Sequence, residues 1–349
     1  MSAQRRLRRV LITGAQGFVG RFCAAHWLRL RPEAQLLGLG RSAALPGFTH
    51  RVCWGERDLP APLPRALVPL LASPRYRYLT QDLLDRPGLE AVLASFHPDA
   101  VVHLASALRG ADPVALETST TRATGSLLEA VAAACPQQPL VLLGSSGGVY
   151  GVPEVLPIPE QHPCAPTYPY ARAKLAAEEV AREVAGRHGL PLVVARIFNP
   201  VGPGQDERHL AGRIGGQLAA IARGLAPPEL SLMPLDATRD FQDVRDVAAA
   251  LVRIAERGEP GSTLNVASGA KTPTSRVWEI LLAAARARGA PPVSVTWLPA
   301  RPGDVPRHQG DVARLRSLGH IDHHPLEESL EALLDWYLGE VAAVAEEHP

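Results

Sequence analysis

The chain has 349 residues, of which 46% are hydrophobic, and a formal net charge of +1. It can therefore bury a full core, and its charge gives no bulk reason to bind nucleic acid or a membrane surface. No run of about eighteen apolar residues occurs, so no segment is expected to span a bilayer. Four cysteines (Cys23, Cys53, Cys135 and Cys164) lack disulfide or metal-ligand spacing, which predicts a cytoplasmic protein without a metal site.

The first elements along the chain enclose a glycine-rich turn. Residues 10–13 form an apolar, β-branched run that predicts a strand, and a helical pattern continues to Leu28. Between them, Gly14 permits a tight turn, Gly17 lets the backbone approach a pyrophosphate, and Gly20 lets the helix pack closely on the strand. The phosphates would then lie on the N-terminus of the helix. This order of elements predicts a dinucleotide cofactor.

The second predicted strand, residues 35–40, ends in Arg41 and Ser42. Proteins that bind NAD usually carry an acidic residue here, which contacts the ribose 2′-hydroxyl. An arginine beside a hydroxyl instead suits a 2′-phosphate, so the sequence favours NADP(H). Alternatively, Arg41 stacks on adenine or faces solvent, which would leave the cofactor preference open.

Apolar runs at residues 76–79, 100–104, 139–143 and 192–196 predict four further strands, each preceded by a helical stretch. Strands that are apolar on both faces and alternate with helices indicate an α/β fold with a doubly wound parallel sheet of the Rossmann type. The proline-rich connection from Ala43 to Arg75 contains one possible helix, Arg65 to Leu71. We interpret the rest of this connection as a mobile loop or, alternatively, as a lid.

The pattern of elements becomes mixed after the last of these strands, from Asn199 onward. Shorter elements separated by glycine and proline suggest a smaller, interleaved C-terminal substrate lobe. We expect residues 1–197 to form the dinucleotide-binding domain, with 240–268 returning to it. Residues 198–239 and 269–349 would mainly form the substrate-binding lobe.

Three polar residues in two segments are candidates for catalysis. Ser146 follows a predicted strand, and a hydroxyl at the carboxyl end of a parallel strand faces the crevice where ligands bind. Alternatively, it only satisfies backbone groups at the strand end. Tyr170 and Lys174 are four residues apart, so on a helix both can meet the same ligand.

Lys174 is one of only two lysines among 36 basic residues. At about 4 Å and an effective dielectric constant of about 20, an ammonium group lowers the pKa of a phenol by roughly three units. The pKa of Tyr170 would then fall from about 10 to near neutrality, which suits an acid/base catalyst. The alternative is a surface helix on which the tyrosine and the lysine have no chemical role.

Three motifs occur in this order: the glycine turn, a serine turn at residues 145–151, and the Tyr-x-x-x-Lys motif. Their order and spacing resemble those of extended short-chain dehydrogenases/reductases that act on nucleotide sugars. The motifs are most similar to those of GDP-4-dehydro-6-deoxy-D-mannose reductases and GDP-mannose 4,6-dehydratases. The resemblance covers nearly the whole chain and implies that Ser146, Tyr170 and Lys174 are the catalytic set. It also implies a homodimer, formed through helices at Leu116–Ala134 and Tyr170–Arg187.

The family pattern also assigns binding residues by their position in the motifs. The cofactor would be held by Gly14, Gln16, Gly17, Phe18, Val19, Gly20, Arg41, Ser42, Asp82, Leu83, Leu104, Ala105 and Ser106, with Tyr170 and Lys174. The nucleotide sugar would be held by Ser146, Asn199, Arg239, Arg301 and Asp304. Arginine suits a diphosphate because its hydrogen bonds are charge-assisted and often bidentate. For Arg239, and more so for Arg245, ion pairs with Asp240, Asp243 or Asp246 are the alternative.

Two glycines in the serine turn, Gly147 and Gly148, depart from the family pattern. Family dehydratases are similar in carrying an acid two residues before Tyr150, where this chain has Gly148, so dehydration is disfavoured. The glycines either leave room for a sugar bulkier than a 6-deoxyhexose or permit an unusual backbone turn.

The resemblance therefore predicts NADPH-dependent reduction of a 4-keto nucleotide sugar, with GDP as the nucleotide, in sugar or specialised-metabolite biosynthesis. One alternative is a nucleotide-sugar epimerase with tightly bound NAD(P). The other is a non-catalytic nucleotide sensor on the same fold, because a fold alone does not establish activity.

Overall fold

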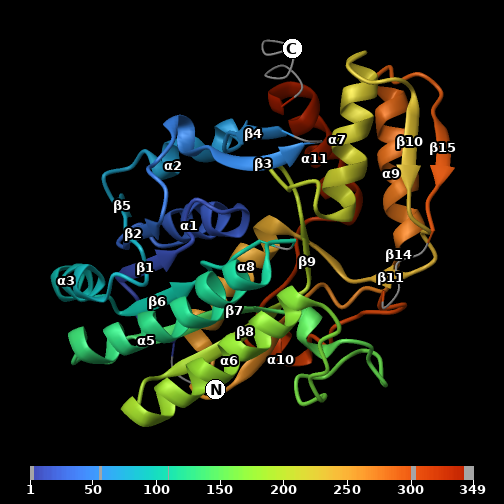
Figure 1. Ribbon diagram of the computed structural model, residues 1–349. Coiled ribbons are helices and arrows are strands. Elements are labelled where there is room, and N and C mark those ends of the chain that lie inside the picture. Colours follow the sequence, from blue (N-terminus) through green and yellow to red (C-terminus); the bar gives the residue numbers. More distant parts are fainter. Residues whose placement is uncertain (1–3, 55–56, 109, 300–303, 342–349) are drawn as a thin grey trace.

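The computed structural model describes residues 4–54, 57–108, 110–299 and 304–341 (Figure 1). Its centre is a parallel sheet of seven strands in the order β13-β8-β7-β6-β1-β2-β5. These strands are β1 (Arg9–Thr13), β2 (Gln35–Gly40), β5 (Tyr76–Thr80), β6 (Ala100–His103), β7 (Leu140–Ser146), β8 (Leu192–Ile197) and β13 (Thr263–Val266). The doubly wound sheet is thus confirmed. The strand order reverses between β1 and β6, which opens a crevice at their carboxyl ends.

Helices cover both faces of the sheet, so the strands are apolar on both sides. Helices α1 (Phe18–Leu30) and α8 (Val244–Arg257) pack together on one face. Helices α3 (Arg86–Phe96), α5 (Ala123–Ala134) and α6 (Pro169–His188) cover the other face. Because side chains alternate along a strand, Val10 and Ile12 enter the first core, whereas Leu11 enters the second.

The expected helix from Leu116 to Ala134 is not one continuous α-helix. Helix α4 (Pro113–Leu116) leads into a π-helical turn at Glu117–Arg122, and α5 follows. Such turns are rare and often occur near functional sites. Thr121 of this turn donates a hydrogen bond to the backbone carbonyl of Ala173 on α6 (3.3 Å).

A separate apolar core is formed by elements that lie beside the sheet in Figure 1. It is enclosed by α7 (Leu210–Ala222), α9 (Thr274–Ala287), α11 (Leu326–Trp336) and β10 (Glu229–Leu232), which pairs with β15 (Ser294–Trp297). Two short pairings join this region to the sheet side: β9 (Asn199–Val201) with β12 (Phe241–Asp243), and β11 (Thr238–Arg239) with β14 (Thr272–Pro273). No helix in the described ranges is long and apolar enough to cross a membrane.

The connection between β2 and β5 contains more structure than the sequence predicted. The expected helix is present as a 3-10 turn at Arg65–Leu67 followed by α2 (Val68–Leu71). An antiparallel hairpin, β3 (His50–Trp54) and β4 (Arg57–Ala61), was not predicted. Its Val52 and Ala61 are buried in the core around α7 and α11. A contact with residues so distant in sequence cannot be seen in a local pattern.

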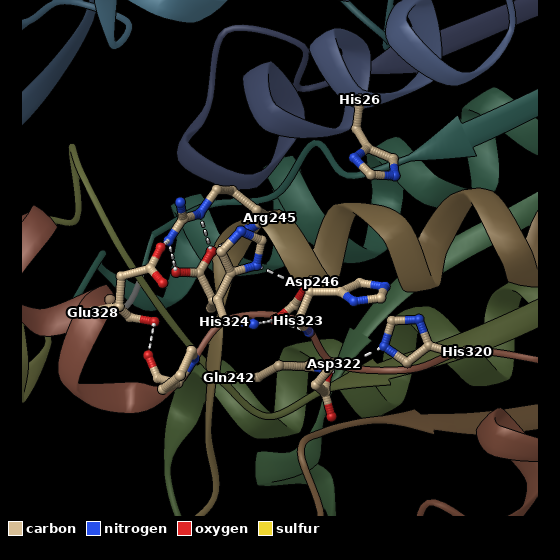
Figure 2. Close-up of polar contacts among 12 residues, drawn as sticks. His26, Gln242, Arg245, Asp246, His320, Asp322, His323, His324 and Glu328 are labelled. Carbon is tan, nitrogen blue, oxygen red and sulfur yellow. Dashed lines mark hydrogen bonds and ion pairs between the residues drawn. The ribbon is translucent and has the colours of Figure 1, made fainter.

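The segment between α10 (Ala313–Ser317) and α11 returns to the N-terminal turn of α8 (Figure 2). The carboxylate of Asp246 accepts hydrogen bonds from the backbone N–H groups of His323 (3.2 Å) and His324 (3.0 Å). The imidazole Nδ1 of His324 lies 2.9 Å from the same carboxylate. Beside it, Arg245 pairs with Asp243 at 2.8 Å, so the structural alternative for this arginine is confirmed.

Candidate active site

A cleft of about 480 Å³ lies at the carboxyl ends of the central strands. This size suits a ligand pocket. The cleft is lined by every predicted catalytic, cofactor-binding and substrate-binding residue within the described ranges. Arg301, the remaining predicted substrate residue, lies outside the described residues. In the described part of the chain, no group of three or more His, Cys, Asp or Glu side chains could hold a metal ion.

The glycine turn has the close backbone packing that a dinucleotide site needs. Gly14 has a φ of +67°, and a Cβ there would lie 2.7 Å from the backbone nitrogen of Ala105. A Cβ on Gly20 would lie 2.1 Å from the Gly14 carbonyl oxygen, so only glycine lets α1 start so close to β1. No side chain caps α1 at Gly17, which leaves the helix N-terminus to face the cleft. These residues fit the phosphates of a nicotinamide dinucleotide.

The end of β2 forms the next part of the cleft wall. Arg41 is exposed there, and its Nη1 donates a hydrogen bond to Ser119 Oγ at 3.1 Å. The Tyr78 hydroxyl donates to the backbone carbonyl of Ser42 at 2.7 Å, which orders the turn after the strand. Asp82 follows β5 and also lines the cleft. A guanidinium therefore stands where NAD-binding proteins usually have a carboxylate.

The Tyr-x-x-x-Lys pair lies on the first turns of α6. The Lys174 ammonium is buried, donates a hydrogen bond to the Gly144 carbonyl at 2.9 Å, and lies 5.9 Å from the Tyr170 ring centroid. Burial lowers the pKa of Lys174 to about 8, and the charge of Glu178 partly opposes this shift. The alternative that Lys174 lies on a surface helix is therefore wrong, because its side chain is buried and lines the cleft.

Ser146 is the last residue of β7 and lines the cleft. Its Oγ also accepts a hydrogen bond from the backbone N–H of Gly148 at 3.1 Å. Both functions expected for this serine are thus compatible, because one hydroxyl oxygen can accept from the backbone while its proton is donated elsewhere.

A buried ionic network beneath α6 was missed by the sequence analysis. The carboxylate of Glu178 is fully buried and accepts hydrogen bonds from the Ser145 hydroxyl, from Arg196 (2.8 Å) and from Arg182 (2.8 Å). Burial alone would raise the pKa of Glu178, but these donors hold it below its usual value. Arg196 also lies over the Tyr150 ring, 4.7 Å from its centroid. The only local signal was the four-residue spacing between Lys174 and Glu178.

The two unusual glycines do not open extra space. A Cβ on Gly147 would lie 2.9 Å from the Phe198 ring and 3.0 Å from the His308 ring. A Cβ on Gly148 would lie 2.1 Å from the Tyr168 hydroxyl oxygen. Neither glycine has a positive φ, so neither provides a special backbone turn. The room expected beside these glycines is therefore absent, because the Phe198 and His308 rings and the Tyr168 hydroxyl already occupy it.

The wall opposite β1 comes from residues that follow β8. Asn199 lines the cleft and donates a hydrogen bond to the Asp240 carbonyl at 2.8 Å. The Asp240 carboxylate is buried and accepts hydrogen bonds from Ser268 and from the backbone of Gly269. Burial raises the pKa of Asp240 to about 6, against the effect of these hydrogen bonds. The next residue, Arg239, lines the cleft and bonds the Thr238 carbonyl at 2.9 Å.

Comparison with known proteins agrees with this geometry. Residues 10–267 match the model of the NAD dependent epimerase/dehydratase family. The chain is 33% identical to the GDP-6-deoxy-D-mannose reductase of Pseudomonas aeruginosa, over 78% of this chain and 89% of the relative. It is 32% identical to the dTDP-6-deoxy-L-talose 4-dehydrogenase (NAD(P)(+)) of Kitasatospora kifunensis, over 97% of each chain.

Among solved structures, the fold is similar to RMD from Pseudomonas aeruginosa complexed with NADPH. The TM-score is 0.73 at 27% identity, covering 95% of this chain and 99% of that one. The chain therefore belongs to the NAD dependent epimerase/dehydratase family, in agreement with its resemblance to extended short-chain dehydrogenases/reductases that act on nucleotide sugars.

Proposed function

We propose that this protein reduces the ketone of a 4-keto nucleotide sugar, with NADPH as the reductant and GDP as the nucleotide. The observation that carries the proposal is the joint lining of one cleft by the glycine turn, by Ser146, Tyr170 and Lys174, and by Arg239. Two of its relatives support a redox reaction on a 6-deoxyhexose, since one is named a reductase and the other a 4-dehydrogenase.

The chemistry divides between the cofactor and three side chains. NADPH, when bound, supplies the hydride. Tyr170 donates its phenolic proton to the oxygen of the former ketone, and Ser146 donates a hydrogen bond to the same oxygen. With a pKa of about 8, Lys174 is mainly charged at neutral pH and stabilises the tyrosinate that remains. The same ammonium would also hold the nicotinamide ribose.

The substrate would lie against the wall formed by Asn199, Arg239 and Asp304. In this proposal Arg239 binds the diphosphate, because a guanidinium forms charge-assisted hydrogen bonds with phosphate oxygens. Arg41, at the other end of the cleft, would bind the 2′-phosphate of NADPH. The homodimer implied by the resemblance and the cytoplasmic location predicted from the cysteines remain predictions.

The epimerase alternative uses the same three catalytic residues, and the family description includes epimerases. The two activities differ in how they use the cofactor. A reductase consumes one NADPH for each sugar reduced, whereas an epimerase copurifies with its dinucleotide and needs no addition. We expect incubation with GDP-4-keto-6-deoxymannose to oxidise NADPH in a 1:1 ratio with sugar reduced. Inversion of a sugar carbon without net NADPH oxidation would establish the epimerase, and absence of both reactions would exclude both activities on this sugar.

A further inference from the structure

A second tyrosine stands beside the proposed acid in the cleft. Tyr168 lines the cleft and precedes α6 in extended backbone conformation (φ −131°, ψ 156°). Its ring is nearly parallel to that of Tyr170, with centroids 6.4 Å apart and an interplanar angle of 8°. Two phenols that are two residues apart in the chain therefore line the same cleft.

The Tyr168 hydroxyl occupies a well-defined place in the wall. If residue 148 had a Cβ, that atom would lie 2.1 Å from the Tyr168 hydroxyl oxygen and 3.3 Å from Ser146 Oγ. The phenolic oxygen thus stands where any side chain at position 148 would begin, next to the serine hydroxyl. Any side chain at position 148 would therefore require this phenol to move.

The serine turn is fixed against the Tyr168 phenol by contacts with His308 on its other side. His308 Nε2 lies 3.0 Å from the Gly147 carbonyl oxygen, and its ring is 4.7 Å from that of Phe198. Since a carbonyl only accepts hydrogen bonds, Nε2 carries the proton. Burial lowers the pKa of His308 to about 4, so the imidazole is neutral at physiological pH. This contact keeps Gly148 against Tyr168.

We propose that Tyr168 is a specificity-determining residue that binds the hydroxyl on carbon 3 of the sugar. This inference rests on the proposed reduction of a 4-keto sugar. If Ser146 and Tyr170 hold the ketone oxygen on carbon 4, the phenol beside Ser146 meets a substituent on a neighbouring carbon. In a 4-keto-6-deoxyhexose, the only hydroxyl on a carbon next to the ketone is that on carbon 3. A hydrogen bond from Tyr168 thus distinguishes sugars by the hydroxyl on carbon 3.

The direct test is Tyr168→Phe, which keeps the ring and removes the oxygen. We expect kcat/KM for GDP-4-keto-6-deoxymannose to fall about tenfold, mainly through KM, as for a lost binding hydrogen bond. The variant and the wild type should act equally on the 3-deoxy analogue of this sugar. Tyr76→Phe is a matched control, because Tyr76 also packs its hydroxyl near a glycine, Gly38, but does not line the cleft. Tyr76→Phe should leave kcat/KM unchanged for both the 3-hydroxy sugar and its 3-deoxy analogue.

Equal kinetics of wild type and Tyr168→Phe on the 3-hydroxy sugar would overturn the assignment. An equal loss on the 3-hydroxy sugar and on its 3-deoxy analogue would also overturn it. If the wild-type enzyme does not oxidise NADPH with any 4-keto nucleotide sugar, the proposed function fails and the sugar contact fails with it.

A double-mutant cycle tests the geometry without relying on turnover. Gly148→Ala should lower the melting temperature of the wild type, because the new methyl group displaces the Tyr168 hydroxyl. In a Tyr168→Ser background the same substitution should be tolerated, since the phenol is gone. Additive changes in melting temperature would show that positions 148 and 168 do not touch, and would overturn the inference independently of the reaction.

Discussion

Replacing Glu178 by glutamine would leave the Arg196 guanidinium buried without its counter-ion. The carboxylate side chain is 0% exposed and that of Arg196 is 6% exposed, so water cannot replace the lost charge. Removing one partner of such a buried pair costs about 3–5 kcal/mol of unfolding free energy. For 349 residues the entropy of unfolding is about 0.7 kcal/mol/K, so the melting temperature should fall by about 4–7 °C.

The same substitution should alter the pH dependence of the reaction. Glu178 raises the pKa of Lys174, against the larger lowering by burial. Without this carboxylate, the pKa of Lys174 falls below about 8, and the ammonium loses its charge at a lower pH. The alkaline limb of the pH profile of kcat/KM should therefore move toward neutrality in Glu178→Gln.

Arg182→Gln is the matched control for this prediction. It removes another arginine bound to Glu178, but the Arg182 side chain is 42% exposed. A pair with an exposed partner contributes only about 0–1 kcal/mol, so the melting temperature should change by about 1 °C or less. The measurement is the melting temperature of each variant relative to the wild type. A drop in Glu178→Gln no larger than that of the control would refute the buried-pair argument.

Three further predictions concern catalysis, cofactor choice and acid stability. Tyr170→Phe should bind NADPH normally and lose at least about 100-fold in kcat, and a near-wild-type rate would exclude it as the acid. Arg41→Ala should weaken NADPH binding by about 1–3 kcal/mol and leave NADH unchanged in titrations, whereas equal losses would indicate stacking on adenine. Burial first, and then nearby Arg29, lower the pKa of His26 to about 4. The unfolded chain binds more protons between that pH and about 6.5, so stability falls on acidification. Between pH 6.5 and 4.5, the free energy of unfolding measured by denaturant titration should fall by about 2 kcal/mol less in His26→Gln than in the wild type. An equal fall in both proteins would contradict this prediction.

Local sequence patterns determined the sheet and the cofactor end of the cleft. Six of the seven strands could be predicted because each is a continuous apolar run, whereas the short edge strand β13 was not predicted. The glycine turn could be predicted because Gly14 and Gly20 meet geometric demands within seven residues of chain. Likewise, the four-residue spacing of Tyr170 and Lys174 is enough to place them on one side of a helix.

The tertiary structure alone decided the contacts between distant segments. The buried side chains of the hairpin at 50–61 pack against helices more than 140 residues away in sequence. No local pattern encodes such a contact. The second acidic partner of Arg245, Glu328, comes close only because α11 returns to this end of α8. The role of Gly148 likewise became visible only when folding brought the Tyr168 hydroxyl against it. Packing is a property of pairs of surfaces, and the chain assembles these pairs only when it folds.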